Sequence, residues 1–283
     1  MSDLAGPGSN LAGPGTDLRA LLSAVTELAQ RAGAEILEVY AQDFEVISKT
    51  DQSPLTQADL RAHRVIVQGL QALDASIPVL SEEASDIPFE QRRAWRRYWL
   101  VDPLDGTKEF VSRNGEFTVN IALIEDHAPV LGVVYVPVRR TSYQGIVNQG
   151  AWRQVGDAPA TPIQVQTPAA ATLRIVGSRS HAAPGTLDQY LPGLGPHTLL
   201  SVGSSLKFCL VAEGSADLYP RFGPTSEWDT AAAHAVVEAA GGQVVDPQGR
   251  PLRYNTKPDL LNPHFFVYGD MSRNWLRLLG QRG

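Results

Sequence analysis

The spacing of hydrophobic residues predicts helices in the N-terminal part of the chain. Apolar side chains recur every three to four positions over residues 18–36, which indicates a helix with one face against a core. Thr56 is a candidate cap for a second helix that continues to about residue 73. Between the two helices, residues 44–49 alternate between apolar and polar positions as a β-strand does.

Short apolar runs bounded by turns predict sheets in the rest of the chain. The first group of expected strands covers residues 79–80, 97–101, 117–124 and 130–136. Later strands are expected at residues 173–176, 198–202, 216–219, 243–245 and 265–268, with helices at 204–213 and 228–240. This alternation of strands and helices is typical of a layered α/β architecture.

Glycine and proline mark two places where the pattern changes. Residues 1–15 contain the sequence Leu-Ala-Gly-Pro-Gly twice and are expected to form a flexible tail. A looser region in the middle of the chain contains Gly156, Pro159, Pro162 and Pro168. We therefore expect an N-terminal α+β domain over residues 16–158 and a C-terminal α/β domain over residues 159–283.

Composition and charge narrow the function without identifying it. The 283 residues are 43% hydrophobic and 19% charged, which is ordinary for a globular protein with a sizeable core. A net charge of −6 argues against nucleic acid polymers as partners, but not against a small anionic substrate. Cys209 is the single cysteine, so no intrachain disulfide is possible and a cytoplasmic location is expected. No apolar run approaches the roughly 18 residues of a membrane span, so no transmembrane segment is expected.

The sequence Asp102-Pro-Leu-Asp-Gly-Thr107 is the strongest candidate for chemistry. A strand-like apolar run ends here in two aspartates, followed at once by a glycine and a hydroxyl. Two carboxylates and the carbonyl oxygen of Leu104 are ligands that a hard divalent cation prefers, and a glycine turn offers N–H groups to an anion. A cation site beside an anion site is what metal-assisted phosphate chemistry requires.

Two further acidic residues fit the same interpretation. Glu82 follows the strand expected at residues 79–80, and Asp229 opens the alanine-rich helix expected later in the chain. Each acidic residue also has a purely structural explanation. Asp229 would favour the helix dipole, Asp102 and Asp105 would shape a proline-containing turn, and Glu82 would end a strand in solvent. Turn formation alone does not require so many ligand types within six residues, so the set as a whole favours a metal site.

The aspartate motif is one of several strings that carry a family resemblance. These strings are Val79–Glu83, Arg97–Phe110, Asn114–Ile124, Ser178–His181, Gly203–Gly214, Tyr219–Thr225 and Trp228–Asp229. Together they resemble the inositol monophosphatase superfamily of lithium-sensitive, magnesium-dependent phosphatases, and most closely its bacterial 3′(2′),5′-bisphosphate nucleotidases, over about residues 20–270. The resemblance implies a five-layer α/β/α/β/α sandwich of the inositol monophosphatase and fructose-1,6-bisphosphatase type. Metals would lie in the cleft between its two halves.

The resemblance also implies roles for the acidic residues. Two Mg²⁺ ions, with a third and weaker one left open, would be held by Glu82, Asp102, the Leu104 carbonyl, Asp105 and Asp229. Glu82 and Thr107 would position the attacking water, and the amides of Gly106 and Thr107 would hold the phosphoryl oxygens. Asp59 would lie near this water or near the third metal. The alternative for Asp59 is a helix capping box with Thr56.

Four residues outside the acidic set would hold the nucleoside and the second phosphate of a substrate. They are His181, Ser204, Lys207 and Arg221. Ser204 and Lys207 open a helix, whose N-terminus favours phosphate, and Arg221 follows a strand. Their structural alternatives are an N-cap for Ser204, a solvated helix residue for Lys207 and a loop side chain for His181.

The function implied by the resemblance is Mg²⁺-dependent hydrolysis of adenosine 3′,5′-bisphosphate to AMP and phosphate. The reaction would proceed by in-line attack of a metal-activated water and would clear a by-product of sulfate assimilation. The nearest alternative is a broader sugar-phosphate phosphatase acting on inositol 1-phosphate or fructose 1,6-bisphosphate. A non-catalytic nucleotide or metal sensor is the alternative from another class. The sequence leaves monomer and homodimer open. For some relatives, peripheral attachment to the cytoplasmic face of the inner membrane is suggested, and this sequence shows no anchor for such an attachment.

Overall fold

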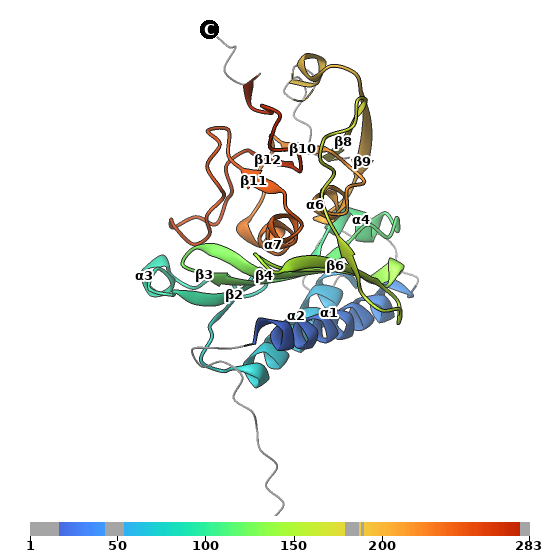
Figure 1. The fold of residues 1–283 in the computed structure, drawn as a ribbon. Helices are drawn as coiled ribbons and strands as arrows, with labels where there is room; N and C mark the ends of the chain where they lie inside the picture. The colour runs from blue at the N-terminus through green and yellow to red at the C-terminus, as the bar shows by residue number, and fades with distance from the viewer. Residues whose placement is uncertain (1–16, 43–53, 179–186, 188–189, 278–283) are drawn as a thin grey trace, which may run out of the picture.

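A computed structural model describes residues 17–42, 54–178, 187 and 190–277, without the side chains of residues 54–56 and 178. The glycine- and proline-rich tail, the strand expected at residues 44–49 and the predicted substrate residue His181 all lie outside the described residues. Within the described part, helices and two β-sheets alternate in layers (Figure 1).

Helices α1 (Leu18–Tyr40) and α2 (Pro54–Leu73) form one outer layer (Figure 1). The Asp17 side chain caps α1 by accepting a backbone N–H of the first turn at 2.9 Å. Helix α2 ends where the sequence predicts but begins two residues before Thr56, because proline suits the first helical position. The prediction of Thr56 as the cap of this helix, in a capping box with Asp59, is therefore wrong.

The first sheet has seven strands in the order β1-β2-β3-β4-β5-β6-β7. The strands are β1 (Val79–Ser81), β2 (Arg97–Asp105), β3 (Thr118–Glu125), β4 (Ala128–Val136), β5 (Thr141–Ile146), β6 (Gly150–Val155) and β7 (Thr161–Ile163). Neighbours are antiparallel except β1 and β2, which run parallel. The four predicted strands are confirmed, but β2 continues beyond its predicted end because it pairs with β3 again at Asp105, after a register shift.

The second sheet has five strands in the order β11-β12-β10-β8-β9. The strands are β8 (Leu173–Ser178), β9 (His197–Val202), β10 (Leu218–Arg221), β11 (Gln243–Val245) and β12 (Phe265–Tyr268). Strand β12 runs antiparallel to β10 and β11, whereas β8 runs parallel to β9 and β10. The predicted strands of this half are confirmed, with β10 displaced two residues toward the C-terminus.

Helices α6 (Leu206–Ala212) and α7 (Ala231–Ala239) lie between the two sheets, as Figure 1 shows. Helices α1 and α2 cover the other face of the first sheet. The 3₁₀-helix η2 (Leu191–Leu194) and Trp275 pack against the outer face of the second sheet. The succession of layers is the α/β/α/β/α sandwich that the sequence predicts.

Helix α7 lies close to the first sheet because two strand residues beneath it are glycines. A Cβ atom at Gly132 of β4 would lie 2.1 Å from the carbonyl oxygen of Ala232, and one at Gly145 of β5 would lie 2.7 Å from the Cα of Val236. Either side chain would push the helix off the sheet. The helix predicted at residues 228–240 is divided, because its first turn is the separate 3₁₀-helix η3 (Glu227–Asp229). The two glycines therefore set how closely η3 approaches the first sheet.

Three short helices complete the first half: α3 (Phe89–Arg92), α4 (Thr107–Val111) and the 3₁₀-helix η1 (Pro137–Arg139). The chain passes from the first sheet to the second between Ile163 and Leu173, and the division into domains at residues 158 and 159 stays a prediction. Among the helices that the structure describes, none is long and apolar enough to cross a membrane. The oligomeric state and the cytoplasmic location also stay predictions.

Candidate active site

Three of the predicted acidic residues converge from two distant parts of the chain. Asp102 and Asp105 belong to β2, and Asp229 belongs to η3. One carboxylate oxygen from each lies within 4.8 Å of those of the other two. The approach of η3 to the first sheet therefore creates a compact group of carboxylates, which we call the acidic cluster.

The register shift in β2 explains how two residues of one strand join the acidic cluster. Residues three apart in a regular strand point to opposite faces of the sheet. Here the regular pairing with β3 is interrupted between Asp102 and Asp105, so both carboxylates reach the same site. The Asp102 carboxylate also accepts the Leu104 N–H at 3.0 Å, which holds the irregular backbone in place.

The third member, Asp229, has a structural role as well. Its carboxylate accepts the N–H of Ser226 at 2.8 Å, and the Ser226 side chain accepts an N–H of η3 in return. This reciprocal arrangement is a capping box at the start of η3. Asp229 therefore both stabilises the start of η3 and belongs to the acidic cluster, so its structural explanation and its metal-site explanation are compatible.

Burial disfavours the charged forms of all three carboxyl groups, and repulsion within the cluster adds to this effect for Asp102 and Asp229. Desolvation raises the pKa of Asp102 well above its ordinary value, and the charges of Glu82, Asp105, Asp229 and Asp59 raise it further. Desolvation and the charge of Asp105 raise the pKa of Asp229 to about 8. Desolvation also raises the pKa of Asp105, although the nearby Lys207 ammonium opposes this shift. Such a cluster is stabilised by a proton or by an added cation.

The other predicted metal residues surround this cluster. Glu82 directly follows β1, and its N–H donates to the Val101 carbonyl at 3.1 Å. Asp59 is buried on α2, and Leu104 is buried within β2. Both Glu82 and Asp59 act electrostatically on Asp102, so their carboxylates lie near the acidic cluster.

A cavity of about 310 Å³ opens beside the acidic cluster. Seven of the predicted residues line it: Asp105, Gly106, Thr107, Ser204, Lys207, Arg221 and Asp229. Gly106 turns the chain from β2 into α4 with a φ of +96°, and a Cβ atom there would lie 3.2 Å from the Cα of Phe117. Only glycine suits this turn, which brings Thr107 to the cavity wall.

The two predicted cations of the cavity are both bonded to backbone carbonyls. The Lys207 ammonium donates to the carbonyls of Val202 and Ser204, at 3.2 and 2.5 Å. Lys207 is only 5% exposed, so the alternative of a solvated helix residue is wrong. Burial lowers its pKa to about 8, although the negative charge of Asp105 counteracts this shift. Arg221 donates to the carbonyl of Pro224 at 2.9 Å.

Ser204 occupies a turn and not the cap position of α6. Its φ of +48° lies in the left-handed region, and Ser205 is the residue that precedes the helix. The Ser204 side chain still accepts the Leu206 N–H at 3.3 Å. The prediction that Ser204 is the N-cap of this helix is therefore wrong, because Ser205 occupies that position. Ser204 lies at the cavity wall.

A set of neutral residues around Asp105 was missed by the sequence analysis. The Ser205 N–H donates to the Asp105 carboxylate at 2.6 Å, and the Asn120 amide donates to the same oxygen at 3.4 Å. The Ser205 hydroxyl bonds the side chains of Asn120 and Thr118, at 2.8 and 2.9 Å. The available signal was the pair of polar residues, Thr118 and Asn120, at the start of strand β3, which is apolar over residues 121–124.

The donor set of the acidic cluster suits a hard divalent cation. Carboxylate oxygens are the preferred ligands of Mg²⁺, and a few carboxylates are enough because water completes its coordination. Three converging carboxyl groups with raised pKa values outnumber the two nearby cations, Lys207 and Arg221, and leave negative charge for a metal ion to balance. The residues present therefore fit a divalent metal site.

Comparison with known proteins agrees with this geometry. The profile of the Inositol monophosphatase family matches residues 17–270. The chain is 54% identical over 250 residues to the 3′(2′),5′-bisphosphate nucleotidase CysQ of Escherichia coli O157:H7, covering 87% of this chain and 99% of the relative. It is 38% identical over 257 residues to the protein of the same name from Haemophilus influenzae, covering 90% of this chain and 95% of the relative.

Solved structures show the same fold. CysQ from Bacteroides thetaiotaomicron, a bacterial member of the inositol monophosphatase family, superposes with a TM-score of 0.80 at 43% identity, covering 90% of this chain and 98% of that one. An inositol monophosphatase from Zymomonas mobilis superposes with a TM-score of 0.74 at 23% identity, covering 94% of this chain and 99% of that one, a likeness of fold alone. With a family profile over residues 17–270 and relatives that match 87% and 90% of its length, the chain belongs to the inositol monophosphatase family.

Proposed function

We propose that the protein is a Mg²⁺-dependent phosphomonoesterase that converts adenosine 3′,5′-bisphosphate to AMP and phosphate. The observation that carries this proposal is the acidic cluster at the wall of a cavity that Lys207 and Arg221 also line. Negative and positive groups on one cavity suit a phosphate ester together with a metal. The relatives named 3′(2′),5′-bisphosphate nucleotidase support the choice of substrate.

Enzymes of this family use divalent metal ions, and we propose two Mg²⁺ ions for this chain. The ligands would be Glu82, Asp102, the Leu104 carbonyl, Asp105 and Asp229. When bound, the metal would neutralise charge on the transferred phosphoryl group and make water a better nucleophile. The buried carboxylates contribute by holding this charge at a fixed place, so that little reorganisation is needed during the reaction.

The chain's own groups would orient the reactants for in-line displacement. The Thr107 hydroxyl and the Glu82 carboxylate would hold the attacking water opposite the 3′-oxygen, with Asp59 nearby. The amides of Gly106 and Thr107 would bind phosphoryl oxygens as negative charge spreads over them. The water oxygen forms a new bond to phosphorus as the bond between phosphorus and the 3′-oxygen breaks. A proton from the water ends on the 3′-oxygen, which leaves as the 3′-hydroxyl of AMP.

The substrate's remaining phosphate and nucleoside would bind on the side of the cavity formed by the second half of the chain. Lys207 and Arg221 carry the positive charge there, and Ser204 adds a hydroxyl. His181 is proposed for the same role from the sequence alone. Positive charge beside the acidic cluster would favour a substrate with two separated phosphates over one with a single phosphate.

Comparing three substrates tests this proposal. We expect Mg²⁺-dependent phosphate release with a higher kcat/KM for adenosine 3′,5′-bisphosphate than for inositol 1-phosphate or fructose 1,6-bisphosphate. Omitting Mg²⁺ and adding a chelator should remove the activity on all three. A higher kcat/KM for either sugar phosphate would overturn the proposed substrate, and metal-independent hydrolysis would overturn the mechanism.

A further inference from the structure

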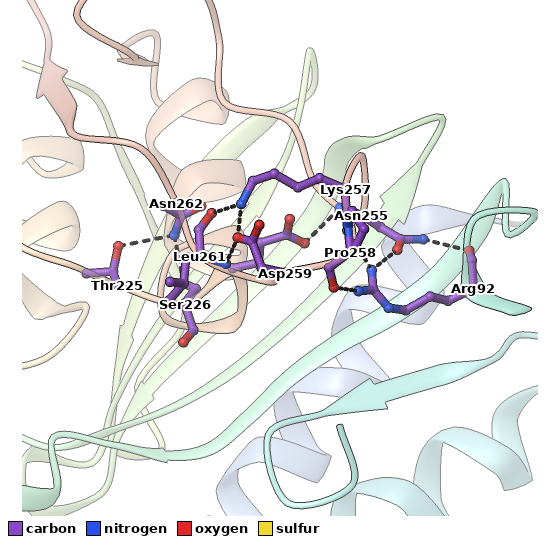
Figure 2. Close-up of polar contacts among 10 residues, drawn as sticks. Arg92, Thr225, Ser226, Asn255, Lys257, Pro258, Asp259, Leu261 and Asn262 are labelled. Atoms are coloured by element: carbon purple, nitrogen blue, oxygen red, sulfur yellow. Dashed lines mark hydrogen bonds and ion pairs between the residues drawn. The ribbon is translucent and has the colours of Figure 1, made fainter. Parts of the chain in front are cut away.

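Residues 255–262, between β11 and β12, form a segment that lies against Thr225 and Ser226, just before η3 (Figure 2). We call residues 255–262 the clamp segment. The Glu227 N–H donates to the Leu260 carbonyl and the Asn262 N–H donates to the Thr225 carbonyl, both at 2.8 Å. These bonds pair the clamp segment with residues 225–227, at the start of η3, in an isolated antiparallel bridge between Ser226 and Leu261.

One end of the clamp segment is anchored to the first half of the molecule. The buried guanidinium of Arg92, on α3, donates to the Asn255 side chain and to the Pro258 carbonyl. Asn255 donates back to the Arg92 carbonyl at 2.7 Å, and its own N–H donates to the Glu227 carboxylate at 2.7 Å. Figure 2 shows this end to the right, with the Arg92 side chain directed at the segment.

At the other end, the Asn262 side chain adds to the backbone bonds. Its amide nitrogen lies 2.7 Å from the Ser226 carbonyl oxygen, 3.1 Å from the Thr230 hydroxyl and 3.2 Å from the Thr225 hydroxyl. Ser226 and Thr230 lie on either side of Asp229, and the Ser226 N–H donates to the Asp229 carboxylate at 2.8 Å. A single amide therefore holds the backbone before Asp229 and the side chain after it.

We infer that Asn262 is a positioning residue for Asp229. Asn262 is not among the residues of the acidic cluster or of the cavity wall. It acts through Ser226 and Thr230, which fix where η3 presents the Asp229 carboxylate. Because it acts through Asp229, this role rests on the proposed function. Groups that orient a ligand from behind typically change metal affinity by about ten- to a hundredfold when they are removed.

The chemistry of the position calls for an amide. Only an N–H or O–H donor can bond the Ser226 carbonyl, and a side-chain amide, unlike a hydroxyl, has two hydrogens to share among one carbonyl and two hydroxyls. An aspartate of the same shape would place an oxygen against the Ser226 carbonyl and repel it. The Thr225 hydroxyl could still donate to that aspartate, whereas the Thr230 hydroxyl already donates to the Glu227 carbonyl. The backbone bonds from Glu227 to Leu260 and from Asn262 to Thr225 do not depend on the side chain and would still hold the clamp segment.

Calorimetric titration of the metal-free protein with Mg²⁺ tests the inference without measuring hydrolysis. We expect Asn262→Ala to raise the Mg²⁺ dissociation constant about tenfold. The control is Tyr190→Phe, which removes another 2.7 Å bond from a side chain to a backbone carbonyl, on the outer face of the second sheet. It should lower the thermal stability of the metal-free protein and leave Mg²⁺ binding unchanged. Equal Mg²⁺ binding by wild type and Asn262→Ala would overturn the inference.

The variant Asn262→Asp keeps the test decisive if the alanine variant does not fold. The added negative charge would by itself attract Mg²⁺, so weaker binding would have to come from displacement of Asp229. We expect a dissociation constant at least threefold above that of the wild type, and tighter binding would contradict the inference. A wild-type protein that binds no Mg²⁺ would instead overturn the proposed function, which separates the two failures.

Discussion

The protein holds buried aspartates in two different ways. Asp217, beside the second sheet, accepts the backbone N–H groups of Ala170 and Arg174 and two bonds from the Arg174 guanidinium. Burial alone raises the pKa of Asp217, but these bonds outweigh burial and lower the pKa overall. In the acidic cluster, burial and like charges raise the pKa of Asp102, Asp105 and Asp229 together.

The difference separates a structural carboxylate from functional ones. Asp217 has a positive partner and four donors, so its charge is compensated within the fold. The three carboxyl groups of the acidic cluster, with Glu82 and Asp59 acting on them, outnumber the two nearby cations, Lys207 and Arg221, so negative charge is left for something outside the chain to balance. Perturbed groups of this kind gather at functional sites because the fold tolerates them there at a cost in stability.

Removing one charge from the acidic cluster should give the largest effect. We expect Asp105→Asn to lower kcat for adenosine 3′,5′-bisphosphate about a thousandfold, because a charged ligand is replaced by a neutral one. The metal-free variant should unfold at the same temperature as the wild type or higher, since a buried like charge is gone. Phosphate release and thermal unfolding with a chelator measure the two effects. Wild-type activity would show that Asp105 is not needed.

An aspartate-to-asparagine substitution at Asp217 should have the opposite effect: it should lower the stability of the protein and leave its activity unchanged. Asp217→Asn leaves Arg174 without its charged partner and offers one acceptor oxygen where the carboxylate offered two. We expect a loss of about 2–3 kcal/mol in the free energy of unfolding, measured by urea titration. The kcat at a temperature well below unfolding should match the wild type. A loss of activity without a loss of stability would contradict the division between the two environments.

The stability of the metal-free protein should depend on pH in opposite directions through the two environments. Because the pKa values of the acidic cluster are raised, the folded state binds more protons than the unfolded state. The stability that these protons give the folded state is complete below about pH 4 and is lost as the pH rises. Because the pKa of Asp229 is about 8, thermal stability in chelator should fall between about pH 4 and pH 8. The lowered pKa of Asp217 acts in reverse, and its contribution is lost only in acid.

With saturating Mg²⁺, the thermal stability should fall less steeply between about pH 4 and pH 8, because the cation replaces the protons of the acidic cluster. Asp105→Asn should also reduce the slope, whereas Asp217→Asn should leave it unchanged above pH 5. Differential scanning fluorimetry across this range, with chelator or with Mg²⁺, provides the measurement. Stability of the chelated protein that rises toward pH 8 would mean that the acidic cluster does not bind extra protons in the folded state.

Local motifs made part of the site predictable from the sequence. Asp102, Asp105, Gly106 and Thr107 lie within six residues, so one turn fixes their neighbourhood wherever the fold places it. Strands β3 and β4 were equally predictable, because their apolar runs are long and a short polar turn joins them. The convergence of Asp229 with this turn depends on how closely α7 packs on the first sheet. Only the family resemblance, and not local spacing, indicated it.

The parts that were not predictable depend on contacts between distant segments. Lys207 has the spacing of a surface helix residue, and only the packed structure shows its ammonium bonded to two carbonyls. The start of α2 was misplaced because a threonine cap and a proline at the first position compete as local signals. Asn262 carries no local motif, and its importance follows from three acceptors more than thirty residues away.

The smallest predicted effect concerns how Asp105 itself is held. The bond of 2.6 Å from Ser205 to the Asp105 carboxylate comes from the backbone N–H, which a substitution does not remove. We therefore expect Ser205→Ala to change kcat less than threefold, although it loses the hydroxyl bonds to Asn120 and Thr118. Asn120→Ala removes a side-chain donor to Asp105 and should cost more, about five- to tenfold. The reverse order would show that the Ser205 hydroxyl, and not the backbone and the Asn120 amide, fixes Asp105 within the acidic cluster.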